Sequence, residues 1–167
     1  WELALETPKE NPARYEILKR LTNVRAAAGE FADADNWLQL AVNWRENILG
    51  GKDPKIADDL LISVNLCRGM KDFDRALVIL RRVQGLHAEM YTFDSRQVAD
   101  DFSRTAQIFG EQKKLENAIT DLDVAIGIRT RLGGPLDPSL ILDLDRLGEY
   151  QTVQRAYDEA EAAFHHV

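Results

Sequence analysis

Three histidines and one glycine-rich segment are the residues of this chain most easily linked to chemistry. A zinc site needs three or four ligands at suitable spacing, and His87, His165 and His166 are not accompanied by such a set. The segment 49–52, Leu-Gly-Gly-Lys, resembles the end of a phosphate-binding loop but lacks the earlier glycine and the following hydroxyl. We therefore predict no metal site, no cofactor and no catalytic residues, and we do not expect an enzyme.

Two pairs of adjacent aspartates, Asp58-Asp59 and Asp100-Asp101, are of the residue type used in general acid–base catalysis. The two pairs are 42 residues apart. The same interval separates three further residues, Arg45, His87 and Arg129. Recurrence at one interval is typical of a structural position rather than of a single active site. We interpret the aspartates as a repeated helix surface, and the second set as a polar surface position that tolerates substitution.

A period of 42 residues organises the whole chain of 167 residues. It is clearest in four alanines, Ala34, Ala76, Ala118 and Ala160. Each alanine follows a large apolar residue by three positions, which places both residues on one helical face. Four copies in one phase indicate a repeat protein whose stacked units share a continuous core.

Every repeat begins with a residue that favours a helix start, and these residues are Asn11, Asp53, Ser95 and Asp137. Proline follows the first, second and fourth of them, as is common in the first helical turn. We predict first helices over 13–28, 55–70, 97–112 and 139–154. Second helices are predicted over 31–49, 73–91, 115–132 and from 157 onward. The repeats then cover 12–53, 54–95, 96–137 and 138–167, the last truncated, after a segment 1–11 that forms the tail of a preceding repeat or a linker.

Within each repeat, the apolar positions predict which helix face is buried. One such position of the first helix is Val24, Leu66, Ile108 and Tyr150. Three residues earlier, Ser63 and Thr105 place hydroxyls at a usually buried position, where they can bond to their own helix carbonyls. The turn between the two helices contains glycine only in the first repeat, at Gly29.

Composition and charge exclude several classes of function. The net charge of −7 makes general affinity for nucleic acid unlikely and favours basic protein partners. No apolar run approaches the roughly 18 residues of a membrane span, so no membrane association is expected. Cys67 is the single cysteine, and its apolar surroundings in the sequence indicate a buried structural thiol. We expect a cytoplasmic location, although the chain reads as part of a longer protein that can carry targeting signals elsewhere.

The segment Leu18-x-x-Leu21 followed by Gly29-x-Phe31-x-x-Ala34 resembles the helix–turn–helix pattern of tetratricopeptide repeats. The usual period of that family is 34 residues. The longer period and the Asp-Pro entries here resemble the repeats of kinesin light chains. The resemblance implies an all-α fold, a right-handed α-solenoid of stacked antiparallel hairpins. It also implies a non-enzymatic scaffold that binds an extended or helical peptide in the concave groove lined by the first helices.

The resemblance further implies which side chains face that groove. They are Lys19, Asn23, Asp58, Leu61, Asn65, Arg68, Asp100, Ser103, Gln107, Glu111, Asp145 and Glu149. Three carboxamides in one row, Asn23, Asn65 and Gln107, are suited to hydrogen bonding with a peptide backbone. The acidic side chains of the later repeats predict a peptide with basic residues at that end. Lys19, Asn23 and Asn65 also match part of the clamp by which some tetratricopeptide domains hold acidic C-termini, but Ser103 and Gln107 replace its basic residues.

Two other classes of function stay open at this point. The array can be a structural spacer that self-associates through its uncapped ends, or a regulatory sensor attached to an output domain. The residues of this chain do not separate these two, nor do they identify the partner.

Overall fold

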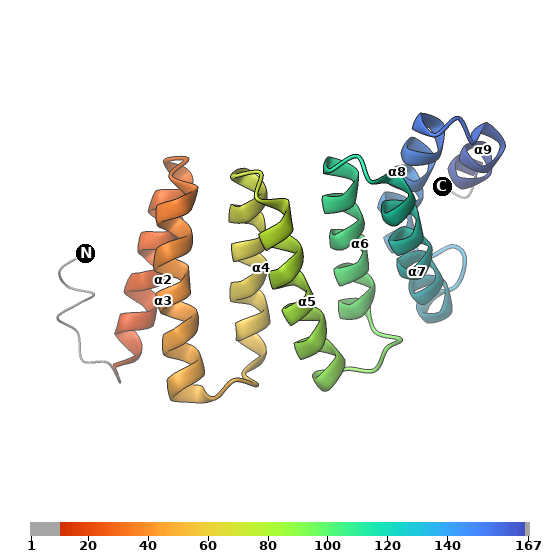
Figure 1. The fold of residues 1–167 in the computed structure, drawn as a ribbon. Coiled ribbons are helices and arrows are strands. Elements are labelled where there is room, and N and C mark those ends of the chain that lie inside the picture. Colours follow the sequence, from red (N-terminus) through yellow and green to blue (C-terminus); the bar gives the residue numbers. More distant parts are fainter. Residues whose placement is uncertain (1–10, 166–167) are drawn as a thin grey trace. The chain divides into compact units, whose positions relative to one another are not determined.

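The structure, a computed structural model, describes residues 11–165, which fold into helices joined by short turns (Figure 1). In this range the helices are α2 (Pro12–Ala27), α3 (Phe31–Leu49), α4 (Pro54–Gly69), α5 (Phe73–Met90), α6 (Arg96–Glu111), α7 (Leu115–Gly133), α8 (Ile141–Val153) and α9 (Tyr157–His165). The 3-10 turn η1 (Pro138–Leu140) precedes α8. The predicted all-α class and helix order are confirmed, with η1 replacing the first turn of the helix predicted at 139. Residues 1–10 of the predicted tail, and His166, lie outside the described range.

The chain divides into two compact units between Leu86 and His87, inside α5. The N-terminal unit contains α2, α3, α4 and most of α5, and the C-terminal unit contains the end of α5 and α6 to α9. In the N-terminal unit α2 and α3 form a hairpin, and α3 packs against α4. In the C-terminal unit α6–α7 and α8–α9 are hairpins, and α7 packs against α8.

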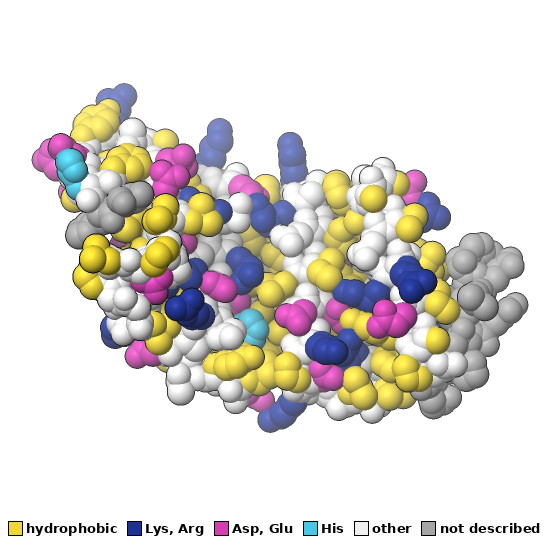
Figure 2. All heavy atoms as spheres, turned by 180° about the vertical axis from the view of Figure 1, so that it is seen from behind, with side chains coloured by type: hydrophobic (Ala, Val, Ile, Leu, Met, Phe, Trp, Pro, Cys, Tyr) yellow, Lys and Arg dark blue, Asp and Glu magenta, His cyan; other side chains and the backbone are white. Residues whose placement is uncertain are grey.

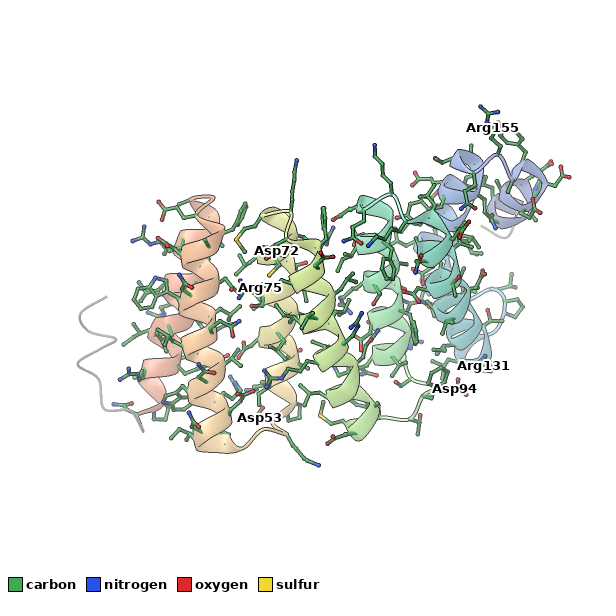
Figure 3. The ribbon with its side chains drawn as sticks, in the orientation of Figure 1. Asp53, Asp72, Arg75, Asp94, Arg131 and Arg155 are labelled. Carbon is green, nitrogen blue, oxygen red and sulfur yellow. The ribbon has the colours of Figure 1, made fainter. Side chains whose placement is uncertain are left out.

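The four predicted helix caps are present. Each side chain accepts a hydrogen bond from a backbone amide of the first turn: Asn11 from Ala13 at 2.9 Å, Asp53 from Lys55 at 2.8 Å, Ser95 from Val98 at 3.3 Å and Asp137 from Ser139 at 2.8 Å. Such caps satisfy amides that have no partner within the helix. Asp53, labelled in Figure 3, thereby fixes the point at which the chain turns from α3 into α4.

The phased alanines lie in the core. Ala34, Ala76 and Ala118 are fully buried, and Ala160 is nearly so. Cys67 is buried as predicted, and burial raises the pKa of its thiol to about 11. The prediction for Val24 was wrong, since 65% of this residue is exposed whereas Leu66 and Ile108 at the same repeat position are buried. No earlier hairpin among the described residues covers this face of α2.

The turns within the hairpins adopt a left-handed backbone at one position in all four repeats. Its φ angle is 77° at Gly29, 58° at Lys71, 61° at Lys113 and 65° at Arg155; Arg155 is labelled at the α8–α9 turn in Figure 3. After α6, the amides of Lys113 and Lys114 donate to the carbonyls of Gly110 and Phe109, each at 2.9 Å. These bonds close the helix as a C-cap. The geometry is thus kept without glycine, at a steric cost for the side chain.

Replacing Lys113 by glycine should therefore stabilise the protein. Lys113→Gly removes the left-handed strain and is expected to raise the free energy of unfolding by about 0.5–1 kcal/mol, measured by urea denaturation. The control is Lys114→Gly, because Lys114 has a φ of −88° and carries no such strain. It should destabilise the protein slightly by adding freedom to the unfolded chain. Stabilisation by both substitutions, or by neither, would contradict this account of the turn.

Candidate functional site

Three aspartates are buried at equivalent positions, each bonded to a basic residue 14 positions earlier in the chain. Asp59, Asp101 and Asp143 are 2%, 0% and 2% exposed, and their partners are Arg45, His87 and Arg129. Each basic residue lies near the end of a second helix, and each aspartate lies in the first helical turns of the next repeat. The pairs therefore join successive hairpins.

These pairs correct two sequence-based interpretations. Asp59 and Asp101 are not surface residues, and neither are Arg45, His87 and Arg129, which are all buried. A charge that recurs in register can lie at a helix–helix contact as well as on the surface, and the spacing alone does not distinguish the two. Asp58, by contrast, is exposed as predicted.

The N-terminal pair is surrounded by donors. Arg45 Nε lies 3.3 Å from Asp59 Oδ2, and Lys19 Nζ lies 2.7 Å from Asp59 Oδ1. The Tyr15 hydroxyl lies 2.9 Å from each of the two carboxylate oxygens, and its ring lies under the Arg45 guanidinium at 4.1 Å. Burial raises the pKa of Tyr15 to about 12, so its hydroxyl stays a donor at neutral pH. These contacts offset the cost of removing the Asp59 charge from water.

The C-terminal pair also has additional partners. Arg129 Nε lies 2.8 Å from Asp143 Oδ2, and the same guanidinium binds Asp100 at 2.8 Å. The Ser103 hydroxyl donates to Asp143 at 2.9 Å. One arginine thus links α7 to α8 through Asp143 and to α6 through Asp100.

The middle pair is the least satisfied of the three. His87 Nδ1 lies 2.7 Å from Asp101 Oδ2, while Asp101 Oδ1 is buried without a hydrogen bond among the described residues. Arg104 is 3.8 Å from that oxygen, which is too long for a hydrogen bond. Burial raises the pKa of Asp101, because the hydrogen bond and charge of His87 compensate the lost hydration only in part.

A further buried carboxylate was missed by sequence reasoning. Asp35, in α3, accepts hydrogen bonds from the Ser63 hydroxyl and from the Arg75 guanidinium. Arg75 lies at the start of α5 beside Asp72, and both are labelled in Figure 3. The residues 42 and 84 positions after Asp35 are apolar, so no repeat signal marked it. Ser63 therefore bonds to a carboxylate, whereas Thr105 bonds to its own helix carbonyl at 2.9 Å, as predicted for both.

The residues predicted to line a groove fall into two groups. Three of them take part in the contacts just described, namely Lys19, Asp100 and Ser103. Six are exposed, namely Asn23, Asp58, Asn65, Glu111, Asp145 and Glu149, and three are half-buried, namely Leu61, Arg68 and Gln107. Asn23 on α2 and Asn65 on α4 make no side-chain hydrogen bond within residues 11–165. The sequence thus found the surface positions but not the internal contacts of three others.

Figure 2 shows one face of the molecule with side chains coloured by type. Over the N-terminal unit, basic and acidic side chains lie next to each other, with hydrophobic side chains between them. This face of the unit is therefore neither uniformly charged nor uniformly apolar.

The described residues contain no other arrangement that indicates chemistry. No group of three or more histidine, cysteine, aspartate or glutamate residues in this part of the chain is placed to hold a metal ion. None of its helices is long and apolar enough to cross a membrane. Each unit has a shallow surface depression where a hairpin turn meets the next first helix. The linings are Gly29–Asp33 with Met70, and Lys113–Asn117 with Gln154.

Helix hairpins of this length, stacked in register and joined through buried ion pairs, define an α-helical repeat protein. Comparison with solved structures identifies the fold as tetratricopeptide-like. A putative kinesin light chain from P. anserina with nearly identical TPR-like repeats matches with a TM-score of 0.81 and 15% identity, over 99% of this chain and 78% of that one. The predicted resemblance to kinesin light chain repeats is thereby confirmed as a likeness of fold.

Two bacterial-type matches extend this comparison. BtubC (BKLC) from P. vanneervenii has a TM-score of 0.78 and 19% identity, over 96% of this chain and 64% of that one. The apo form of RapI has a TM-score of 0.77 and 15% identity, over 98% of this chain and 57% of that one. The chain therefore spans less than two thirds of either protein. No family model matches the sequence, and no curated protein matches it either.

The three ion pairs should differ in how much stability they contribute. Asp59→Asn leaves Arg45 and Lys19 without their carboxylate and should lower the free energy of unfolding by roughly 3 kcal/mol. Asp101→Asn removes a poorly compensated charge and keeps an acceptor for His87, so its effect should stay within about 1 kcal/mol at pH 7.5. Urea denaturation of both variants measures the difference. Equal losses would show that the number of partners around each carboxylate does not determine its contribution.

Proposed function

We propose that this chain is a protein-interaction module that binds a peptide segment of a partner protein along the exposed faces of its first helices. The tetratricopeptide-like fold supports a binding role, because such repeats present extended surfaces built from successive helices. A fold alone does not define a function, so the proposal rests on particular side chains.

The observation that carries the proposal is the pair Asn23 and Asn65. Both carboxamides are exposed, 42 residues apart on α2 and α4 of one unit, and without a hydrogen bond among residues 11–165. Lys19, on the same helix, is instead occupied by Asp59 at 2.7 Å. A carboxamide offers both a donor and an acceptor, as a peptide backbone does. The pair is suited to holding an extended segment with little dependence on its side chains.

The C-terminal unit adds a preference for charge. Asp145 and Glu149 are exposed one helical turn apart on α8, and Gln107 and Glu111 occupy the corresponding face of α6. Two carboxylates at this spacing favour a partner with basic side chains at this end. A clamp for an acidic C-terminus is disfavoured, because Lys19 is bonded to Asp59 and Ser103 is buried.

The proposed partner is therefore a protein, not a small molecule, a nucleic acid or a membrane, and the proposed role is a scaffold rather than an enzyme. A single, buried and unpaired cysteine is compatible with action in a reducing compartment such as the cytoplasm.

The test uses a peptide selected from a display library against the whole chain. Asn65→Ala should weaken binding of that peptide by about 1 kcal/mol or more, roughly fivefold in Kd, measured by isothermal titration calorimetry. The matched control is Asn43→Ala, which removes an exposed carboxamide from α3. Unchanged affinity of the Asn65 variant, with an unchanged circular dichroism spectrum, contradicts the proposal. Replacing basic residues of the peptide by glutamate should weaken binding further if the charge preference is correct.

Self-association is the second candidate function. It is favoured by apolar residues that are exposed at positions buried in the other repeats. Val24 and Phe164 are 65% and 44% exposed, whereas Leu66 and Leu122 at the equivalent positions are buried. These two faces are suited to contact between copies of the chain or between the chain and a further repeat.

A further inference from the structure

Only one of the three ion pairs that join successive hairpins contains a group that titrates near neutral pH. The first and third pairs use arginine, which stays charged at all physiological pH values. The second uses His87, and histidine is the side chain whose charge ordinarily changes between pH 5 and 8. All three carboxylates are buried to the same degree, so the basic partner is the main difference among the pairs.

The middle pair also lacks the extra donors that support the other two. Asp59 accepts from Tyr15 and Lys19, and Asp143 accepts from Ser103. The residue 40 positions before Asp101, equivalent to Lys19 and Ser103, is Leu61, which has no donor. His87 therefore provides the one hydrogen bond to the Asp101 carboxylate among the described residues.

Few charged groups face the pair from the helices around it. On α5 the neighbour of the His87 ring is the Tyr91 ring, at 5.7 Å between centroids. On α6 they are Arg104, 3.8 Å from Asp101, and Asp100, whose charge opposes that of Asp101. On α7 the relevant charge is Arg129, which binds Asp100 at 2.8 Å. The half-exposed Arg104 is too distant and too hydrated to replace a protonated His87.

We propose that the His87–Asp101 pair makes the packing of the last turns of α5 against the start of α6 dependent on pH, tighter near pH 6 than near pH 8. A protonated imidazole neutralises the buried Asp101 carboxylate and donates to it. A neutral imidazole donates but leaves a net buried charge. The other two ion pairs keep their charges over this range, so the response is confined to one place in the repeat array.

The direction of the effect follows from both groups. A carboxyl whose pKa is raised by burial gives the folded state an advantage at low pH, and that advantage is lost as pH rises through the raised value. The attraction between His87 and Asp101 is likewise lost as the imidazole loses its proton at higher pH. Both terms therefore weaken the packing as the solution becomes more alkaline.

The test is amide hydrogen exchange of the whole chain at pH 6 and pH 8, expressed as protection factors that remove the intrinsic pH dependence. In the wild type, amides at 96–104 should be roughly three- to tenfold better protected at pH 6, as expected for a coupling of up to one pKa unit. Amides at 54–62, beside the Arg45–Asp59 pair, should show no such ratio. Equal ratios in the two segments would overturn the proposal.

Two variants make the result specific to His87. His87→Arg, which installs the residue found at the equivalent positions 45 and 129, should give high protection of 96–104 at both pH values. His87→Gln keeps a donor without a charge and should give low protection at both. If the arginine variant does not fold, as judged by circular dichroism, the glutamine variant decides. A pH ratio that survives in either folded variant contradicts the proposal.

Discussion

The structure depends on one constraint, the burial of a carboxylate at the start of successive first helices. A buried charge is costly unless it is paired and hydrogen-bonded, so Asp59, Asp101 and Asp143 each require a basic residue from the helix before them. Apolar contacts between hairpins tolerate small shifts in position, whereas such a pair favours one register. The ion pairs are therefore the contacts best suited to setting how one hairpin follows the next within each unit.

Most of the fold could be predicted from the sequence because the signals that determine it are local or periodic. The alanines mark the closest approach of the two helices, and the capping residues Asn11, Asp53, Ser95 and Asp137 mark where helices begin. What the period could not show is which way a repeated side chain faces. Asp58 and Asp59 recur together, yet the first is exposed and the second is buried. A step of about 100° along a helix separates the two outcomes.

The candidate site was predicted less completely than the fold. Exposure at Asn23, Asn65, Asp145 and Glu149 agrees with the positions derived from the repeat register. Lys19 and Ser103 do not act as free surface groups, because the charge that occupies them comes from a helix 40 residues away in the sequence. Asp35 was missed for the same reason. Holding the hairpins together and presenting a binding face are thus assigned to different positions of the same first helices.

The most direct test of this account is a double-mutant cycle on Arg129 and Asp143, using Arg129→Gln and Asp143→Asn and urea denaturation. The exposed pair Asp94 and Arg131 (Figure 3), with a closest distance of 2.6 Å, serves as the comparison. We predict a coupling free energy of about 2 kcal/mol or more for the buried pair and less than about 1 kcal/mol for the exposed one. Additive effects of the two substitutions in the buried pair would contradict the claim that buried ion pairs join the hairpins.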